Sequence, residues 1–281
     1  MRIRRQMTTT STIAAVLLGL FLCASARAQQ ASVLDQVPGD ALIVVRVKNL
    51  SATNKKVAKF AKELGLDQMQ PELADPLGAL QKEGHLEKGL NTEGDLAFAF
   101  LDPKLTGGNP EKSMVFVIPV TDFKAFVGNF KDPKDEGGVT KASPPDGGED
   151  VYLAQWGKYA AVSPAKEVLA KKPTGVKLQG AIAKEADAKD LIVYANMNAI
   201  RPMALPHLKD GRQQLMKEVD DALGQAGDMG KKFAPVVRAL VNQIVNVAEG
   251  YLNDATGATL GLGLGDAGVT TTFLTDFKPD S

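Results

Sequence analysis

Residues that could do chemistry are scattered along this sequence and do not form a recognised catalytic motif. Ser163-Pro164-Ala165-Lys166 has the S-x-x-K spacing of the nucleophile in penicillin-binding enzymes, but the companion S-D-N and K-T-G elements are absent. We therefore expect Ser163 to cap a helix. His85 and His207 have no partner at a metal-ligand spacing. A hydrolase of unrecognised type would need one of them to meet a serine and an acid through the fold.

Neighbouring carboxylates and alternating glycines also favour structural roles. Adjacent acids occur at 135–136, 149–150 and 220–221, where polar loops or helix surfaces would keep them solvated rather than pair them as in a glycosidase. Asp102, Asp122, Asp266 and Asp276 are expected to be turn and cap acids. The glycines of 261–265 alternate within a strand with no helix after them, unlike a dinucleotide-binding loop. From the sequence we therefore expect a protein that is not an enzyme, with no catalytic residue, no metal and no cofactor.

One aromatic pair is the best candidate for a contact site. Trp156 lies beside Gly157 and Tyr159 at the tip of a predicted hairpin. An exposed aromatic side chain there would suit protein recognition, so Trp156 and Tyr159 are the predicted binding residues. The alternative is that the tip aromatic folds back onto the sheet.

The composition is that of an ordinary globular protein. The chain has 281 residues, 44% of them hydrophobic, with 33 basic and 33 acidic side chains and a net charge of zero. That balance offers no field to attract nucleic acid. A single cysteine allows no disulfide within the chain.

The first 28 residues have the three parts of a secretory signal peptide. Arg2, Arg4 and Arg5 precede an apolar run at 13–24, and Ala26-Arg27-Ala28 supplies a small-x-small cleavage site. The apolar run is short for an uncleaved anchor. We expect cleavage after Ala28, by the general or the twin-arginine route, which removes four arginines and Cys23 and leaves a net charge of −4. The mature chain is then periplasmic or extracellular, without a transmembrane helix.

Residue periodicity predicts the elements of the mature chain. Strands are expected at 41–48, 96–101, 114–120, 151–155, 159–162, 191–197, 258–264 and 269–273. Helices are expected from Ser51 to Gly65, after Thr121 or Asp122, from Ser163 to about 171, at 201–225 with interruptions at Pro206 and Gly211, and at 231–252. The Pro- and Gly-rich stretch 132–150 is expected to be a mobile loop.

Three short blocks recur in the same order and suggest an internal duplication. The segments 42–45, 96–102 and 120–124 resemble 191–194, 260–266 and 274–278. We expect an α+β fold: a mainly antiparallel sheet from two related strand-helices-strand-strand halves, with long amphipathic helices packed on it. The halves are about 37–131 and 188–278, joined by an inserted hairpin and helix at 150–187, within one exported domain, 29–281. The small residues of 97–99 and 261–265 should face helices, and the large ones a shared core.

The helix at 231–252 carries an apolar stripe whose side chains have to be buried against another surface. Its members are Val237, Leu240, Val241, Ile244, Val245, Ala248 and Leu252. A membrane-surface helix usually presents Lys or Arg on its polar face, whereas here that face is mainly Asn and Gln. We therefore expect a core helix.

With these segments in hand, the chain resembles a family of exported bacterial proteins of unknown function. The resemblance rests on residues 37–42, 120–123, 159–163 and 191–198 and spans most of the mature chain. It implies export and this style of fold, and it supplies no catalytic or binding residues.

The leading hypothesis is an exported, non-catalytic envelope protein that acts by binding or assembly. Its partner would be an unknown envelope protein. A carrier of an apolar ligand in a groove between sheet and helices is the second hypothesis, and a hydrolase of unrecognised type is the third.

Overall fold

A computed structural model of the chain describes residues 32–170 and 173–279. The predicted signal peptide, its cleavage site and Cys23 lie outside these residues. The strands, in chain order, are β1 (Ile43–Val47), β2 (Leu96–Phe100), β3 (Met114–Pro119), β4 (Lys131–Asp135), β5 (Thr140–Ser143), β6 (Val151–Trp156), β7 (Tyr159–Ser163), β8 (Leu191–Ala195), β9 (Ala255–Gly265) and β10 (Gly268–Phe277).

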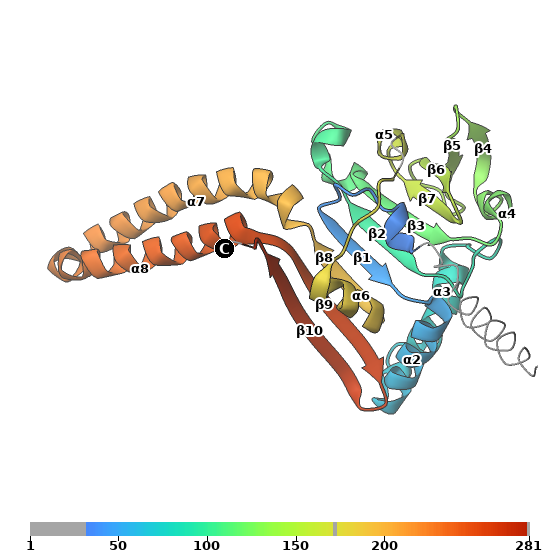
Figure 1. The fold of residues 1–281 in the computed structure, drawn as a ribbon, viewed down its shortest axis with the longest axis horizontal. Helices are drawn as coiled ribbons and strands as arrows, with labels where there is room; N and C mark the ends of the chain where they lie inside the picture. Colours follow the sequence, from blue (N-terminus) through green and yellow to red (C-terminus); the bar gives the residue numbers. More distant parts are fainter. Residues whose placement is uncertain (1–31, 171–172, 280–281) are drawn as a thin grey trace, which may run out of the picture. The chain divides into compact units, whose positions relative to one another are not determined.

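Helices lie between some of these strands, whereas β4 to β7, and β9 and β10, follow one another directly (Figure 1). A 3-10 turn, η1 (Val33–Gln36), begins the described chain. The α-helices are α2 (Leu50–Glu63), α3 (Pro76–Glu83), α4 (Phe123–Val127), α5 (Lys166–Leu169), α6 (Gly180–Ala188), α7 (Met197–Gln225) and α8 (Gly227–Asp254). The described residues from Val33 onward form one compact unit.

Within the described residues, ten strands form a single sheet in the order β10-β9-β8-β1-β2-β3-β7-β6-β5-β4. Every neighbouring pair is antiparallel. The predicted α+β class with a mainly antiparallel sheet is therefore confirmed. β8 and β1, the third and fourth strands in this order, pair from Ile43↔Ala195 to Val47↔Leu191.

The two faces of the sheet differ in the size of their side chains, as the sequence predicts. Ala97 and Ala99 are fully buried and join a core with Val33 of η1 and Val168 of α5. On β9, a Cβ added to Gly261 would lie 2.8 Å from the Glu185 carboxylate of α6, so the small residue admits that helix. The small-residue face thus packs on α6, α5 and η1 rather than on the long helices.

The large-residue face is only partly covered, contrary to the expected shared core. Near β7 and β6 it packs against Phe126 of α4. Elsewhere Phe116 is 40% exposed and Phe273 is 66% exposed. The rings of Phe98 and Phe116 pack on each other with centroids 5.0 Å apart. The sheet therefore has one closed face and one that is open along much of its width.

The strand order is the one that two related halves would give, but the matched residues do not all lie on the same face of the sheet. β1-β2-β3 and β8-β9-β10 are adjacent triplets on either side of the β1–β8 pairing. Val44 faces Tyr194, whereas its sequence match Val193 faces Val45 on the opposite side of the sheet. Asp122 caps α4 while Asp276 lies within β10. Duplication stays a prediction.

Three local predictions are corrected. The stretch 132–150 is not simply a loop, because β4 and β5 form a hairpin whose Gly137-Gly138 turn has positive φ at both glycines. Asn49, not Ser51, caps α2, since its side chain accepts from the Ala52 amide at 2.8 Å. The helix α6 was not expected, and it follows a connection that contains lysine and proline.

The two edge strands of the sheet have contrasting sequences. β4 is Lys-Asp-Pro-Lys-Asp, exposed throughout and irregular in its pairing with β5. β10 has ten residues, three of them consecutive threonines, and its only charged side chain is Asp276. Only β4 therefore has the charge and proline that discourage a further strand from pairing.

A buried arginine ties the central strand to α6. Arg46 of β1 is 3% exposed and points to the closed face. Its guanidinium donates to the Ala186 carbonyl and, at 3.4 Å, to the Lys189 carbonyl, and lies 3.7 Å from the Asp95 carboxylate. A charged group in this position satisfies the carbonyls at the end of α6, which lie over the sheet.

Replacing that charge should destabilise the fold. In Arg46→Met the stem remains, but the carbonyls lose their donor and Asp95 loses its ion-pair partner, so we expect the free energy of unfolding to fall by about 2–3 kcal/mol. Urea denaturation followed by circular dichroism measures it. The control is Lys48→Met, which removes a more exposed donor to the Asp187 carbonyl of the same helix and should cost less than about 1 kcal/mol. Equal losses in the two variants would contradict the assignment.

Candidate binding surface

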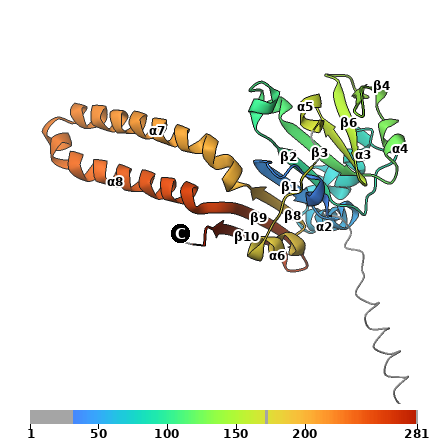
Figure 2. The same cartoon turned by 45° about the horizontal axis from the view of Figure 1, so that its top comes forward.

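The two longest helices form an antiparallel hairpin inserted between β8 and β9. α7 and α8 pack along each other and leave the sheet at the ends of these strands (Figures 1 and 2). Asn196 caps α7 by accepting from the Ala199 amide at 3.3 Å. α7 runs without a break, so the interruptions expected at Pro206 and Gly211 are wrong. Both positions are exposed on a helix that α8 supports along its length.

Side chains at both ends of the hairpin fix its geometry. At the base, the Arg201 guanidinium of α7 donates to the Leu252 and Ala255 carbonyls, each at 2.6 Å, and so holds the end of α8. At the tip, Gly227 has a φ of 62° and makes the turn. A Cβ added to Gly230 would lie 1.8 Å from the Leu223 carbonyl oxygen, so a glycine is required where the helices approach each other.

α8 carries two rows of apolar side chains, and α7 covers only one. Ala234 and Val245 are buried in the row that faces α7, which Val237, Val241, Ala248 and Leu252 complete with partial burial. Leu240 is 59% exposed and Ile244 is 68% exposed. The expectation that this whole stripe lies in the core is therefore wrong for Leu240 and Ile244.

The exposed row extends beyond Leu240 and Ile244 in both directions along α8. Its members, with exposed fractions from 51% to 69%, are Met229, Phe233, Val236, Leu240, Ile244 and Val247. At 100° per residue their side chains fall within an arc of about 80°. We call these six residues the α8 stripe. The sequence showed the apolar periodicity, but which half of the arc α7 covers depends on the tertiary structure.

Trp156 and Tyr159, the predicted binding residues, are buried instead. Trp156 is 7% exposed and Tyr159 is 8% exposed, and both belong to the core on the closed face of the sheet. They face each other across the β6–β7 hairpin. The expectation that an aromatic side chain is exposed at the hairpin tip is therefore wrong. The alternative, in which the side chain folds back onto the sheet, describes the structure.

The two histidines lie apart. His85 is exposed, and its Nε2 lies 2.8 Å from the Asp146 carboxylate, also exposed. His207 is exposed on α7. Ser163 is fully buried, and its Oγ accepts from the Ala165 amide at 3.2 Å, immediately before α5. The described residues therefore do not bring a histidine, an acid and a serine together at these positions.

Most of the acids singled out in the sequence have structural partners. Asp102 accepts from the Lys104 amide at 2.9 Å and Asp122 from the Ala125 amide at 2.8 Å, as expected of cap acids. Asp220 pairs with Arg238 at 2.7 Å across the hairpin. Asp266, in the β9–β10 turn, pairs with Lys59 of α2. Over residues 32–170 and 173–279 no group of three potential ligands is placed to hold a metal ion.

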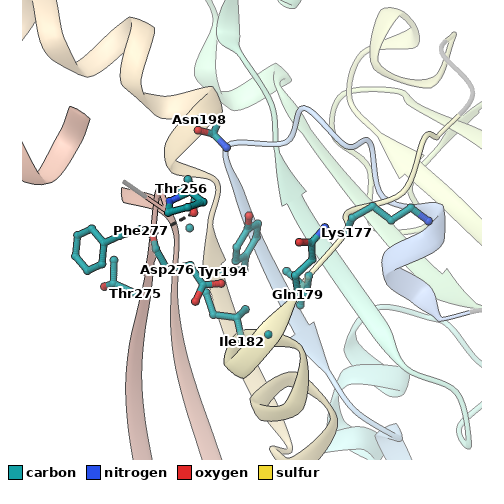
Figure 3. A pocket seen from close by; sticks show the side chains of 13 residues that line it. Lys177, Gln179, Ile182, Tyr194, Asn198, Thr256, Thr275, Asp276 and Phe277 are labelled. Atoms are coloured by element: carbon teal, nitrogen blue, oxygen red, sulfur yellow. Dashed lines mark hydrogen bonds between the residues drawn. The ribbon is translucent and has the colours of Figure 1, made fainter. Parts of the chain in front are cut away.

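A pocket of about 590 Å³ lies where the start of α6 meets β8, β9 and β10 (Figure 3). The side chains that line it are mostly polar: Lys177, Gln179, Tyr194, Asn198, Thr256, Thr275 and Asp276, with Ile182 and Phe277 among the apolar ones. Burial raises the pKa of the Tyr194 phenol, and the nearby Asp276 carboxylate adds to the effect. The phenol therefore stays a neutral hydrogen-bonding group. Such a lining suits a polar ligand better than an apolar one.

Comparisons with known proteins give no family. Neither the protein-family models nor the curated protein sequences match this chain. Among solved structures, crystal form I of TP0453 is similar over 60% of this chain and 64% of that chain, with 9% sequence identity and a TM-score of 0.34. The similar region spans less than two thirds of that chain, and so weak a likeness supports no inference about fold or function. Within the described residues, no helix is long and apolar enough to cross a membrane.

Replacing two glycines by alanine tests the close approach of α7 and α8 at the hairpin tip. Gly230→Ala places a Cβ against the Leu223 carbonyl, so we expect a loss of about 1–3 kcal/mol and faster amide hydrogen exchange in α7 and α8. Gly224→Ala is the control, because a Cβ there meets nothing within 4 Å. It should stabilise the helix by up to about 1 kcal/mol. Two variants with the same effect would show that the tip is loosely packed.

The burial of Tyr159 predicts a loss of stability in alkali. Burial raises its pKa to about 12, with Asp95 and Asp35 adding to the effect, whereas an unfolded tyrosine titrates near 10. Below about pH 10 both states are protonated and stability is complete. Between about pH 10 and 12 the unfolded chain releases the proton first, so the free energy of unfolding should fall by up to about 2 kcal/mol.

Urea denaturation at about pH 9 and about pH 11.5 measures this fall. The comparison is with Tyr159→Phe, in which the contribution of this phenol to the pH dependence is removed. The slope of stability against pH should be smaller in the variant, whatever its absolute stability. A slope as steep as that of the parent chain would mean that Tyr159 titrates normally.

Proposed function

We propose that this chain is an exported protein of the cell envelope that acts by binding or assembly, and that the α8 stripe is its contact surface. The observation that carries the proposal is the row of six exposed apolar side chains on one side of α8. Soluble proteins seldom leave so continuous an apolar surface uncovered unless a partner occupies it. Export is supported by the cationic, apolar and small-residue segments of the first 28 residues.

The way the hairpin is built also supports a contact role. Apart from its base, where α7 meets β9, the hairpin packs mainly on itself, and the sheet closes without it. Apolar side chains on the outer side of α8 therefore add nothing to the sheet's core. A preformed helical hairpin can present such a row with little loss of backbone conformational entropy on binding, which favours recognition over packing as its role.

The carrier hypothesis receives less support from the geometry. The groove between α6 and the sheet exists, but its lining is mainly polar. An apolar ligand there would leave Asp276, Asn198 and Gln179 without water or partners, which is costly. The hydrolase hypothesis lacks a histidine site of the required kind among the described residues. Neither accounts for the α8 stripe.

Photo-crosslinking in intact cells tests the proposed function. A photoreactive amino acid at Leu240 should give a discrete crosslinked product, identified by mass spectrometry, because the stripe is occupied. The matched control is Asn246, exposed on the same helix but outside the stripe. The same preparations should contain a chain that begins at Gln29. Equal crosslinking at the two positions, or a chain retaining its first 28 residues in the cytoplasm, would contradict the proposal.

A further inference from the structure

The α8 stripe has an internal symmetry that allows a second copy of itself to occupy it. From Met229 to Val247 the steps between neighbouring members are four, three, four, four and three residues. Read backwards, the steps are three, four, four, three and four, so the two directions agree to within one residue at every member. A second α8 lying antiparallel therefore presents its side chains at the same levels.

The side chains that would meet are also complementary in size. A two-fold axis at the level of Arg238 places Met229 beside Val247 and Val236 beside Leu240 of a second copy. It brings Phe233 to within one residue of Ile244. Each contact then joins a larger side chain with a smaller or branched one, as interdigitating helices require. A closed two-fold interface of this kind uses the same surface on both copies.

The charges around the stripe permit this arrangement and do not favour a lipid surface. The cations of α8 are Lys231, Lys232 and Arg238, and two of them already pair with acids, Lys231 with Asp228 and Arg238 with Asp220. A helix that lies on anionic lipid normally keeps its cations free for headgroups. Across the two-fold axis, Lys232 reaches the level of Gln243 and Ile244. Arg238 lies at the level of its own copy, but at 100° per residue it is on the side of α8 away from the stripe, where it pairs with Asp220.

The surface area that the two stripes can bury sets the expected affinity of the dimer. Roughly 100 Å² removed from water per apolar side chain gives about 1,200 Å² for the twelve side chains of two copies, near the lower limit for a specific interface. The dimer should therefore be reversible and sensitive to concentration.

We infer that the partner of the α8 stripe is the α8 stripe of a second copy, so that two helical hairpins meet antiparallel about a two-fold axis. This inference rests on the proposed function, because it names the partner of the same surface. The pairing buries six exposed apolar residues on each chain and needs no other protein. In the dimer, the two hairpin bases and their sheets lie at opposite ends of the paired α8 helices. Each pocket is formed by residues of one chain.

Sedimentation velocity over a range of concentrations tests the association, using protein purified after expression of the full-length chain. The parent chain should shift reversibly from one copy to two as concentration rises. Leu240→Glu with Ile244→Glu places charges in the centre of the interface and should weaken the dimer at least about 100-fold. Asn246→Glu adds a charge outside the stripe and should leave it unchanged. Circular dichroism checks that all three remain folded.

Disulfide trapping tests the antiparallel register. In a Cys23→Ser background, mixing Val236→Cys with Leu240→Cys should give a crosslinked pair of the two different variants, as should Met229→Cys with Val247→Cys. Met229→Cys alone should crosslink poorly, because the axis holds its two copies about 27 Å apart along the helices. Efficient trapping of Met229→Cys with itself would show a parallel pairing and overturn the inferred arrangement.

The outcomes separate this inference from the proposed function. A chain that stays single at all concentrations overturns the second copy as partner. If Leu240 still crosslinks to a different protein in cells, the binding function stands and only the partner is wrong. Stripe-dependent binding to vesicles of phosphatidylcholine and phosphatidylglycerol by a single chain would likewise replace the second copy with a lipid surface. A single chain with no stripe-dependent crosslinking in cells overturns both.

Discussion

The antiparallel pairing of β1 with β8 is the contact on which the sheet depends. β1 leads to β2 and β3 and the strands beyond them, whereas β8 leads to β9 and β10, so these five residue pairs join the two parts. Polar groups secure the same region: Arg46 reaches the end of α6, and the Asp190 carboxylate accepts from Lys56 of α2 at 2.6 Å and from the Leu264 amide at 2.8 Å. β1 and β8 are far apart in the sequence, so pairing them costs loop-closure entropy. The polar contacts on both sides of this pairing help to offset that cost.

The helical hairpin uses a property of antiparallel strands. β8 and β9 are neighbours that run in opposite directions, so the end of one lies beside the start of the next. A connection of any length can be inserted there provided that its two ends come together. Arg201 satisfies this condition by binding the carbonyls of Leu252 and Ala255. The sheet is complete without the hairpin, so the outer side of α8 carries residues that the fold itself does not require.

Periodicity in the sequence was sufficient for most of the elements and for the class of fold, but not for α6, for the β4–β5 hairpin or for what covers each surface. Alternation of large and small residues in 96–101 correctly predicted two unlike faces, because strand geometry fixes which residues share a face. It could not show that the large face would remain partly open. The apolar arc of α8 was evident, yet its division between α7 and solvent depends on how two helices lie together. Trp156 illustrates the same limit: hairpin position was predictable, and the direction of the side chain was not.

The unlike edges of the sheet have a consequence for growth by strand addition. A fibre requires each molecule to accept a neighbour at both ends, as repeated head-to-tail contacts do. β4, with Pro133 and four charged side chains in five residues, resists a new strand. β10 has no such protection along its threonines. With only one receptive end per molecule, two β10 strands can meet each other but cannot recruit a third chain, so sheet-to-sheet polymerisation ends at a pair.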